Sequence, residues 1–256
     1  MHFAFPSTLQ ARRQKVSPVL PSVLNDKSRV LVKGLTATSA AGDAEQIKNL
    51  FPCLYGQKSV SFQSGEQGAQ DAVRPVRAAV VLSGGQAPGG HNVITGIYRF
   101  VKESGGTLFG FLNGPKGIFT GNYREITEQD VEKYHNMGGF DMIGSGRDKI
   151  HTDKQFADSL KTCEDLKLDG LVVIGGDDSN TNACMLAEYF ASKGSQVCVV
   201  GAPKTIDGDL KNEFVPVSFG FDTACKTYSE MIGSLAMDAL STKKKYHFVR
   251  LMGRSA

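Results

Sequence analysis

The chain has 256 residues, of which 41% are hydrophobic and 21% are charged, as in an ordinary globular protein of one to two domains. The formal net charge of +3 is too small to imply a nucleic-acid partner, and no apolar run approaches the length of a membrane span. The five cysteines are dispersed and form no C-x-x-C pair, which argues against a disulfide framework or a zinc site. We therefore expect a cytoplasmic protein with no nucleic-acid and no membrane partner.

Residues 1–75 are rich in Ser, Pro, Gly, Gln and Ala and contain only short apolar patches. We expect an N-terminal extension, partly irregular, whose patch at residues 51–55 docks on the body of the protein. The first 25 residues are basic, with no acidic residue before Asp26, which is a weak sign of an organelle transit peptide. Pro6, Pro18 and Pro21 interrupt any amphipathic helix there and argue against that interpretation.

From residue 76 the pattern becomes regular. A β-branched run at residues 78–82 predicts a strand, residues 83–90 form a glycine-rich loop, and a helix follows. We expect Val93, Ile97, Phe100 and Val101 to lie on its buried face. Residues 108–112 then predict a strand, residues 127–137 a helix with Thr127 as its N-cap, and residues 154–166 a further helix.

The clearest unit begins at residue 171. Residues 171–174 form a continuous apolar run, which is typical of a strand buried on both faces of a parallel sheet. A helix capped by Ser179 should follow, then a strand at 197–200, a helix at 221–240 and a strand at 246–251. Repeated strand–loop–helix units predict an α/β fold with a doubly wound, mostly parallel sheet, whose ligands bind at the strand ends.

Three loops at predicted strand ends carry candidate chemistry. Glycines at positions 84, 85, 89 and 90 allow backbone N–H groups to approach an anion, although they also fit a tight turn without a ligand. In the second loop Asp177 and Asp178 follow two glycines. Carboxylates beside a phosphate site make sense if Mg²⁺ lies between them, whereas the alternative is that they only cap the next helix.

The third loop places Lys204, Thr205, Asp207 and Asp209 within six positions. Lys204 is suited to neutralise charge on a transferring phosphoryl group, Asp207 to accept the proton of an attacking hydroxyl, and Thr205 to hold the acceptor or a phosphate oxygen. Arg254, after Met252 and Gly253, is suited to bidentate phosphate binding at a further strand end. The combination indicates phosphoryl transfer.

These motifs resemble the phosphofructokinase family. The likeness is greatest to its pyrophosphate-dependent branch, the diphosphate–fructose-6-phosphate 1-phosphotransferases, and there to the catalytic beta subunit of the long plant type. Matching segments lie at residues 83–90, 144–150, 175–182, 203–210, 220–224 and 252–254. Residues 18–60 also resemble the N-terminal extension of that subunit. The family implies a phosphofructokinase-like sheet and transfer of a phosphoryl group from pyrophosphate to fructose 6-phosphate.

The resemblance also implies roles for individual residues. Asp177 would hold Mg²⁺, and Asp207 would be the catalytic base, with Lys204 beside it. Diphosphate would bind to Gly85, Arg147, Asp178 and Lys204. Fructose 6-phosphate would bind to Thr205, Ile206, Asp207, Lys245, Tyr246, Met252, Gly253 and Arg254, with Lys245 and Tyr246 reaching a neighbouring subunit of a homo-oligomer or of a hetero-oligomer with an alpha-type regulatory subunit.

Two positions select the donor in this family. ATP-dependent members carry glycine in place of Asp178 and usually in place of Lys204. A carboxylate at Asp178 would lie where the α-phosphate of a nucleotide goes and would repel it. The chain retains both the Gly-Gly-Asp-Asp and the Lys-Thr-Ile-Asp pattern, which the alpha-type subunit lacks. We therefore expect pyrophosphate as donor and an ATP-dependent enzyme as the weaker alternative.

Family members continue well beyond the position equivalent to Ala256. We expect three parts: the extension at 1–75, a pyrophosphate- and Mg²⁺-binding α/β domain at 76–217, and the truncated start of a fructose-6-phosphate domain at 218–256. The donor half would then be complete and the acceptor half incomplete. An inactive fragment that only binds phosphate or another subunit is the alternative to an active enzyme.

Overall fold

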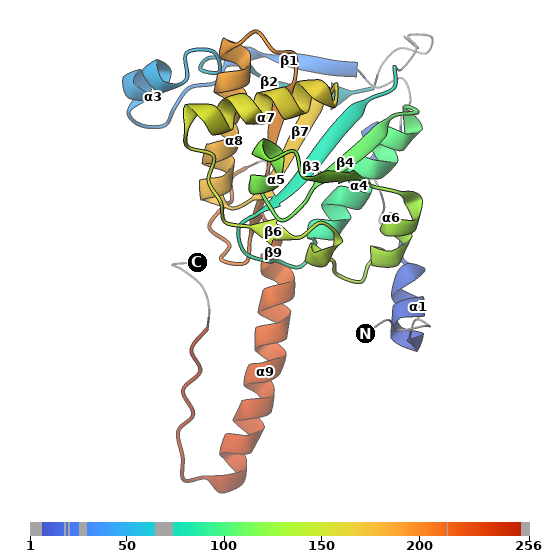
Figure 1. Ribbon diagram of the computed structural model, residues 1–256. Coiled ribbons are helices and arrows are strands. Elements are labelled where there is room, and N and C mark those ends of the chain that lie inside the picture. Colours follow the sequence, from blue (N-terminus) through green and yellow to red (C-terminus); the bar gives the residue numbers. More distant parts are fainter. Residues whose placement is uncertain are drawn as a thin grey trace.

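The computed structural model describes residues 7–17, 19, 21–25, 30–64, 74–213 and 215–251. The N-terminal extension contains two strands that pair antiparallel in a separate small sheet, β1 and β2. Its elements are α1 (Thr8–Gln14), α2 (Ser22–Asn25), β1 (Val30–Ala37), α3 (Ala44–Leu50) and β2 (Lys58–Gln63). In Figure 1 this region, drawn in blue, lies along the outside of the main body.

The extension is fastened to the body by hydrogen bonds. The backbone N–H groups of Cys53 and Leu54 donate to the carboxylate of Glu188, at 2.9 and 3.0 Å. The Nδ2 atom of Asn136 donates to the carbonyls of Arg13 and Val16, both at 2.7 Å. The predicted docking of the 51–55 patch is therefore confirmed, and Glu188 is the residue that holds it.

The main sheet has seven strands in the order β5-β4-β3-β7-β8-β9, with β6 pairing β3 off this path. All its pairings are parallel except that of β4 with β5. The strands are β3 (Arg77–Ser83), β4 (Thr107–Phe111), β5 (Tyr123–Glu125), β6 (Ser145–Gly146), β7 (Gly170–Gly175), β8 (Cys198–Thr205) and β9 (Phe219–Gly220).

Helices cover both faces of this sheet (Figure 1). They are α4 (Gly90–Glu103), α5 (Lys116–Phe119), α6 (Glu128–Tyr134), the 3₁₀ helix η1 (Phe140–Met142), α7 (Asp153–Asp165), α8 (Asp177–Ser192) and α9 (Phe221–Thr242). Val80 and Ile174 pack with α4 and α6 in one core cluster, whereas Val81 and Val173 pack with α5, α7 and α8 in the other. Alternate strand residues thus point to opposite layers, which confirms the predicted doubly wound α/β fold.

The topology creates a crevice at the carboxyl ends of the strands. The chain leaves β3 through α4 to β4 on one side, and it returns later to β7 on the other side. At such a switch point the two connections diverge, and ligands of open α/β sheets bind there. Because β3, β7 and β8 run parallel, their carboxyl ends also share one edge of the sheet.

Several local predictions were right. Thr127 is the N-cap of α6, and it forms a reciprocal capping box with Asp130. Thr152 and Gln155 form the same box at the start of α7. The strand predicted at 171–174 is β7, and the helix predicted at 221–240 is α9.

Other predictions were wrong. On α4 the prediction for Val101 is confirmed, but Val93 and Ile97 are only partly buried and Phe100 is exposed. The buried face is rotated from the one inferred, so that Ile94 and Tyr98 lie at its centre. Ser179 does not cap α8, which already begins at Asp177 after Gly176. β8 continues to Thr205 rather than ending near residue 200, since its residues up to Pro203 pair with β7 and its last two residues pair with β9.

The strand predicted at 246–251 is also absent. These residues are extended and largely exposed, and within the described part of the chain they pair with no strand. In Figure 1 they run back alongside α9, which projects from the body and buries none of its side chains. The apolar pattern alone predicted a strand, but a strand needs a partner for its backbone groups. None of the helices within the described residues is long and apolar enough to cross a membrane.

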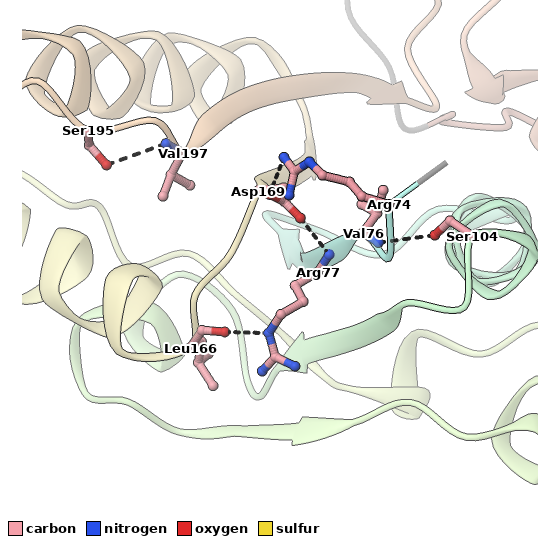
Figure 2. Close-up of polar contacts among 8 residues, drawn as sticks. All are labelled: Arg74, Val76, Arg77, Ser104, Leu166, Asp169, Ser195 and Val197. Carbon is pink, nitrogen blue, oxygen red and sulfur yellow. Dashed lines mark hydrogen bonds and ion pairs between the residues drawn. The ribbon is translucent and has the colours of Figure 1, made fainter. Parts of the chain in front are cut away.

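The opposite edge of the sheet is tied together by Asp169 (Figure 2). Its Oδ2 accepts a hydrogen bond of 2.8 Å from the backbone N–H of Arg77, the first residue of β3. Its Oδ1 lies 2.7 Å from the guanidinium of Arg74. The Arg77 side chain in turn donates to the carbonyl of Leu166 at 2.8 Å. The start of β3 is thereby aligned with the start of β7.

We predict that Asp169→Ala lowers the free energy of unfolding by about 1–2 kcal/mol, because it removes a charged acceptor from a backbone N–H group. Chemical denaturation followed by circular dichroism measures this change. Lys161→Ala, at an exposed position of α7, is the control and should stay within about 0.5 kcal/mol of the wild type. Equal stability of the two variants would contradict the role assigned to Asp169.

Candidate functional site

A cavity of about 600 Å³ lies at the carboxyl ends of β3, β7 and β8. It is the crevice that the topology of the sheet predicts. The residues that the resemblance assigns to diphosphate and Mg²⁺ all line it, whereas Gly89 and Gly90 of the glycine-rich loop do not. Its lining comprises Ser83, Gly84, Gly85, Gln86, Arg147, Asp148, Lys149, Gly176, Asp177, Asp178, Ser179, Asn182, Lys204, Thr205, Ile206, Asp207 and Asp209.

The glycine loop after β3 forms the first wall. Gly84 has a φ of +87°, which favours glycine, and its N–H donates to the carbonyl of Gly146 at 2.8 Å. Ser145 Oγ donates to the Gly84 carbonyl at 2.7 Å. Both backbone polar groups of Gly84 are therefore bound to β6. A Cβ atom on Gly85 would lie 2.9 Å from a guanidinium nitrogen of Arg147. The absence of a side chain at Gly85 therefore lets Arg147 reach the cavity.

The amino end of α8 forms the second wall. Its first turn contains Asp177 and Asp178, and its N-cap is Gly176, so neither carboxylate occupies the capping position. A helix N-terminus carries partial positive charge, which favours acidic side chains and bound anions alike. One turn into the helix, Ser179 Oγ donates to Ser83 Oγ at 2.8 Å. This bond between two buried hydroxyls ties α8 to the end of β3.

Lys204 forms the floor between these walls. It is 6% exposed, and its Nζ donates to the Gly85 carbonyl at 2.6 Å. Burial lowers the pKa of the Lys204 ammonium, the positive charge of Arg147 lowers it further, and the negative charge of Asp207 opposes both. Two cationic side chains thus converge at the loop of Gly85, which suits a ligand of high negative charge.

The turn after β8 forms the third wall. Thr205 Oγ1 donates to Asp209 Oδ1 and accepts from the backbone N–H of Asp207, both at 3.0 Å. The Thr205 hydroxyl therefore fixes the turn that carries Asp207 into the cavity lining. Ile206 lies between them and also lines the cavity. A carboxylate held here faces the same space as Lys204 and the first turn of α8.

The sugar-phosphate residues implied by the resemblance are not all in this cavity. Lys245 and Tyr246 are exposed, with Tyr246 at 93%, and they follow α9 rather than line the site. Met252, Gly253 and Arg254 lie outside the described residues.

Sequence reasoning missed Ser83, Asp148, Lys149 and Asn182 as lining residues. Asp148, Lys149 and Asn182 all lie in segments that resemble the family, at 144–150 and 175–182. The contacts of Lys149 and Asn182 join these two segments, about thirty positions apart, and such contacts leave no local pattern in the sequence.

The carboxylates fit a metal ion that is shared with a ligand. No group of three or more His, Cys, Asp or Glu side chains in the described ranges is arranged to hold a metal by itself. Asp177 and Asp178 nevertheless line the cavity together, at the N-terminus of α8. Mg²⁺ is commonly bound in this way, by one or two carboxylates together with phosphate oxygens and water.

The family model for phosphofructokinase matches residues 77–256. The chain belongs to the phosphofructokinase family. Solved phosphofructokinases share the fold: that of Saccharomyces cerevisiae has a TM-score of 0.57 at 22% identity, covering 65% of this chain and 24% of that one. A pyrophosphate-dependent phosphofructokinase from Nitrosospira multiformis has a TM-score of 0.59 at 19% identity, covering 66% of this chain and 43% of that one.

Curated relatives are more similar in sequence. The chain is 54% identical over 98% of its length to the pyrophosphate–fructose 6-phosphate 1-phosphotransferase subunit beta 2 of Arabidopsis thaliana. It is 56% identical over 93% of its length to the beta subunit of Solanum tuberosum, and 46% identical over 97% to the alpha 2 subunit of Arabidopsis thaliana. The chain spans only 42–44% of the length of these relatives.

We predict that Lys204→Met leaves the free energy of unfolding unchanged or raises it. The lowered pKa means that the folded state binds protons less well than the unfolded chain, so the charge on Lys204 opposes folding below its folded-state pKa. This cost disappears as the pH rises toward the ordinary value of 10.5, and the two proteins should converge there. Urea denaturation at neutral and alkaline pH measures the difference; a loss of more than about 1 kcal/mol in the variant would contradict it.

Proposed function

We propose that this chain provides the donor half of a pyrophosphate-dependent phosphofructokinase. The reaction transfers a phosphoryl group from pyrophosphate to the 1-hydroxyl of fructose 6-phosphate and yields fructose 1,6-bisphosphate and phosphate, reversibly. The relatives that are beta subunits of pyrophosphate–fructose 6-phosphate 1-phosphotransferases support this assignment. The observation that carries it is the convergence of Asp178 and Lys204 on one cavity.

The side chains have distinct parts in the transfer. Asp207 takes the proton of the attacking 1-hydroxyl while the new bond from oxygen to phosphorus forms and the bridging bond of pyrophosphate breaks. Lys204 and Arg147 offset the negative charge that the leaving phosphate gains. Gly85, which has no side chain, leaves space for the Arg147 guanidinium beside the donor. Thr205 and Ile206 contact the sugar phosphate next to Asp207.

Donor choice follows from charge and space. Asp178 excludes a nucleotide because its carboxylate occupies the position that an α-phosphate would take and repels the negative charge of that phosphate. Lys204 places a positive charge close to the two phosphates of pyrophosphate. A compact and highly charged donor gains from both residues, whereas ATP loses contact and meets repulsion.

Mg²⁺ is the metal that suits this donor set. Asp177 holds it, with phosphate oxygens and water as the remaining ligands. When bound, the ion withdraws charge from the donor phosphates and so supports the transfer. Asp178, the next residue of the same helical turn, would line the cavity beside that site.

We place further contacts to the acceptor after the donor domain in the chain. Residues 76–217 form the donor domain, and residues 218–256 begin the domain for the sugar phosphate, with Met252, Gly253 and Arg254 as its first contacts. Lys245 and Tyr246 are exposed on the segment after α9, as a contact to a neighbouring subunit requires. We assign the whole enzyme to carbohydrate metabolism in the cytoplasm, as a homo-oligomer or paired with an alpha-type subunit.

The experiment is a donor titration on the purified chain. With fructose 6-phosphate and Mg²⁺, a coupled assay should detect turnover with pyrophosphate and none with ATP. Asp207→Asn should lower kcat by about 100-fold or more, because the base is removed while its shape is kept. Asp153→Asn, on an exposed residue of α7, is the matched control and should retain full activity.

Two results separate the alternatives. Turnover with ATP equal to that with pyrophosphate would contradict the role of Asp178. Pyrophosphate binding without any turnover would identify the chain as an inactive, phosphate-binding part of the longer enzyme, for which its coverage of 44% of the Arabidopsis thaliana beta 2 subunit is the supporting observation.

A further inference from the structure

The cavity contains more acidic than basic side chains, although we assign it to an anion. Its acidic residues are Asp148, Asp177, Asp178, Asp207 and Asp209, and its basic residues are Arg147, Lys149 and Lys204. One carboxylate of this set can be offset by a metal ion, and Lys204 and Arg147 converge at the loop of Gly85. The carboxylate of Asp178 therefore requires its own cation if a phosphate is to bind beside it.

Lys149 supplies that cation. Its Nζ lies 3.4 Å from Oδ1 of Asp178, and both residues line the cavity. The two side chains are 62% and 76% exposed, so in water the pair adds little to the stability of the fold. A ligand that fills the cavity removes this water, and the attraction between the two charges then becomes stronger.

The backbone holds the two partners in register. Asn182, one turn after Asp178 on α8, accepts from the Ile150 N–H at 3.0 Å and donates to the Ile150 carbonyl at 2.6 Å. Ile150 is 1% exposed and belongs to the core cluster beneath α7 and α8. The residue that follows Lys149 is thus bound at both polar atoms to the helix that carries Asp178. The ion pair is built into two fixed segments rather than formed by chance between mobile loops.

We propose that Lys149 is a positioning residue that makes the donor site selective for pyrophosphate. Its ammonium group holds the Asp178 carboxylate in place and offsets its negative charge when the donor binds beside it. Asp178 can then exclude a nucleotide without repelling the smaller donor. This inference rests on the proposed function for the identity of the anion, and it assigns to Lys149 a role separate from those of Arg147 and Lys204.

The test is a double-mutant cycle read by direct binding, so that it does not depend on turnover. Isothermal titration calorimetry with inorganic pyrophosphate and Mg²⁺ compares the full chain with Lys149→Met, Asp178→Asn and the double variant. Lys149→Met should weaken binding by about 10-fold to 100-fold, because it leaves the Asp178 carboxylate unpaired beside the bound phosphates. In the Asp178→Asn background the same substitution should weaken binding by less than about 3-fold.

Two controls identify a role in positioning. Lys149→Arg keeps the charge, and its affinity for pyrophosphate should lie within about 3-fold of that of the wild type. Lys161→Met, at an exposed position of α7, should have the affinity of the wild type. Thermal unfolding should be the same for all these variants, because the ion pair is exposed without ligand.

The possible failures are distinct. Equal losses from Lys149→Met in both backgrounds would overturn coupling to Asp178, and no loss in either would overturn any role of Lys149 in donor binding. If the wild-type chain itself gave no binding, the proposed donor site would fail as a whole, and this inference would fail with it.

Discussion

The site depends on one constraint, which is that β3, β7 and β8 pair in parallel. Their carboxyl ends must then lie along one edge of the sheet, and the turns that follow them must meet. Asp169 aligns the opposite ends of β3 and β7 through the backbone of Arg77. The glycine loop, the amino end of α8 and the turn of Asp207 owe their common cavity to this register.

A second constraint is electrostatic. The cavity lining contains five carboxylates, so the anion that we propose for it requires cations and a metal ion distributed among them. Lys204 is held at the loop of Gly85, and Lys149 lies beside Asp178. Burial lowers the pKa of Lys204, so the fold retains this charge against its own stability. Such a conflict between stability and binding is typical of functional sites.

Much of the fold and of the site was predictable from the sequence. The buried apolar run of β7 predicts the parallel sheet, and the glycine–carboxylate turn after it predicts the candidate site. Both features are predictable because an apolar strand and an acidic turn are local patterns. Lys149 and Asn182 were not found, because their partners are distant in sequence. The strand expected at 246–251 failed for a related reason: its pattern is local, but its pairing is not.

The most direct test of the account is hydrogen–deuterium exchange with and without Mg²⁺ and pyrophosphate. If the three strand ends form one donor site, the amides of Gly84 and Gly85, of Gly176 to Asp178, and of Thr205 to Asp207 should gain protection together. Amides at the amino ends of the strands, near Arg77 and Asp169, should not change. Protection confined to one turn, or found only at the opposite edge, would contradict the central claim.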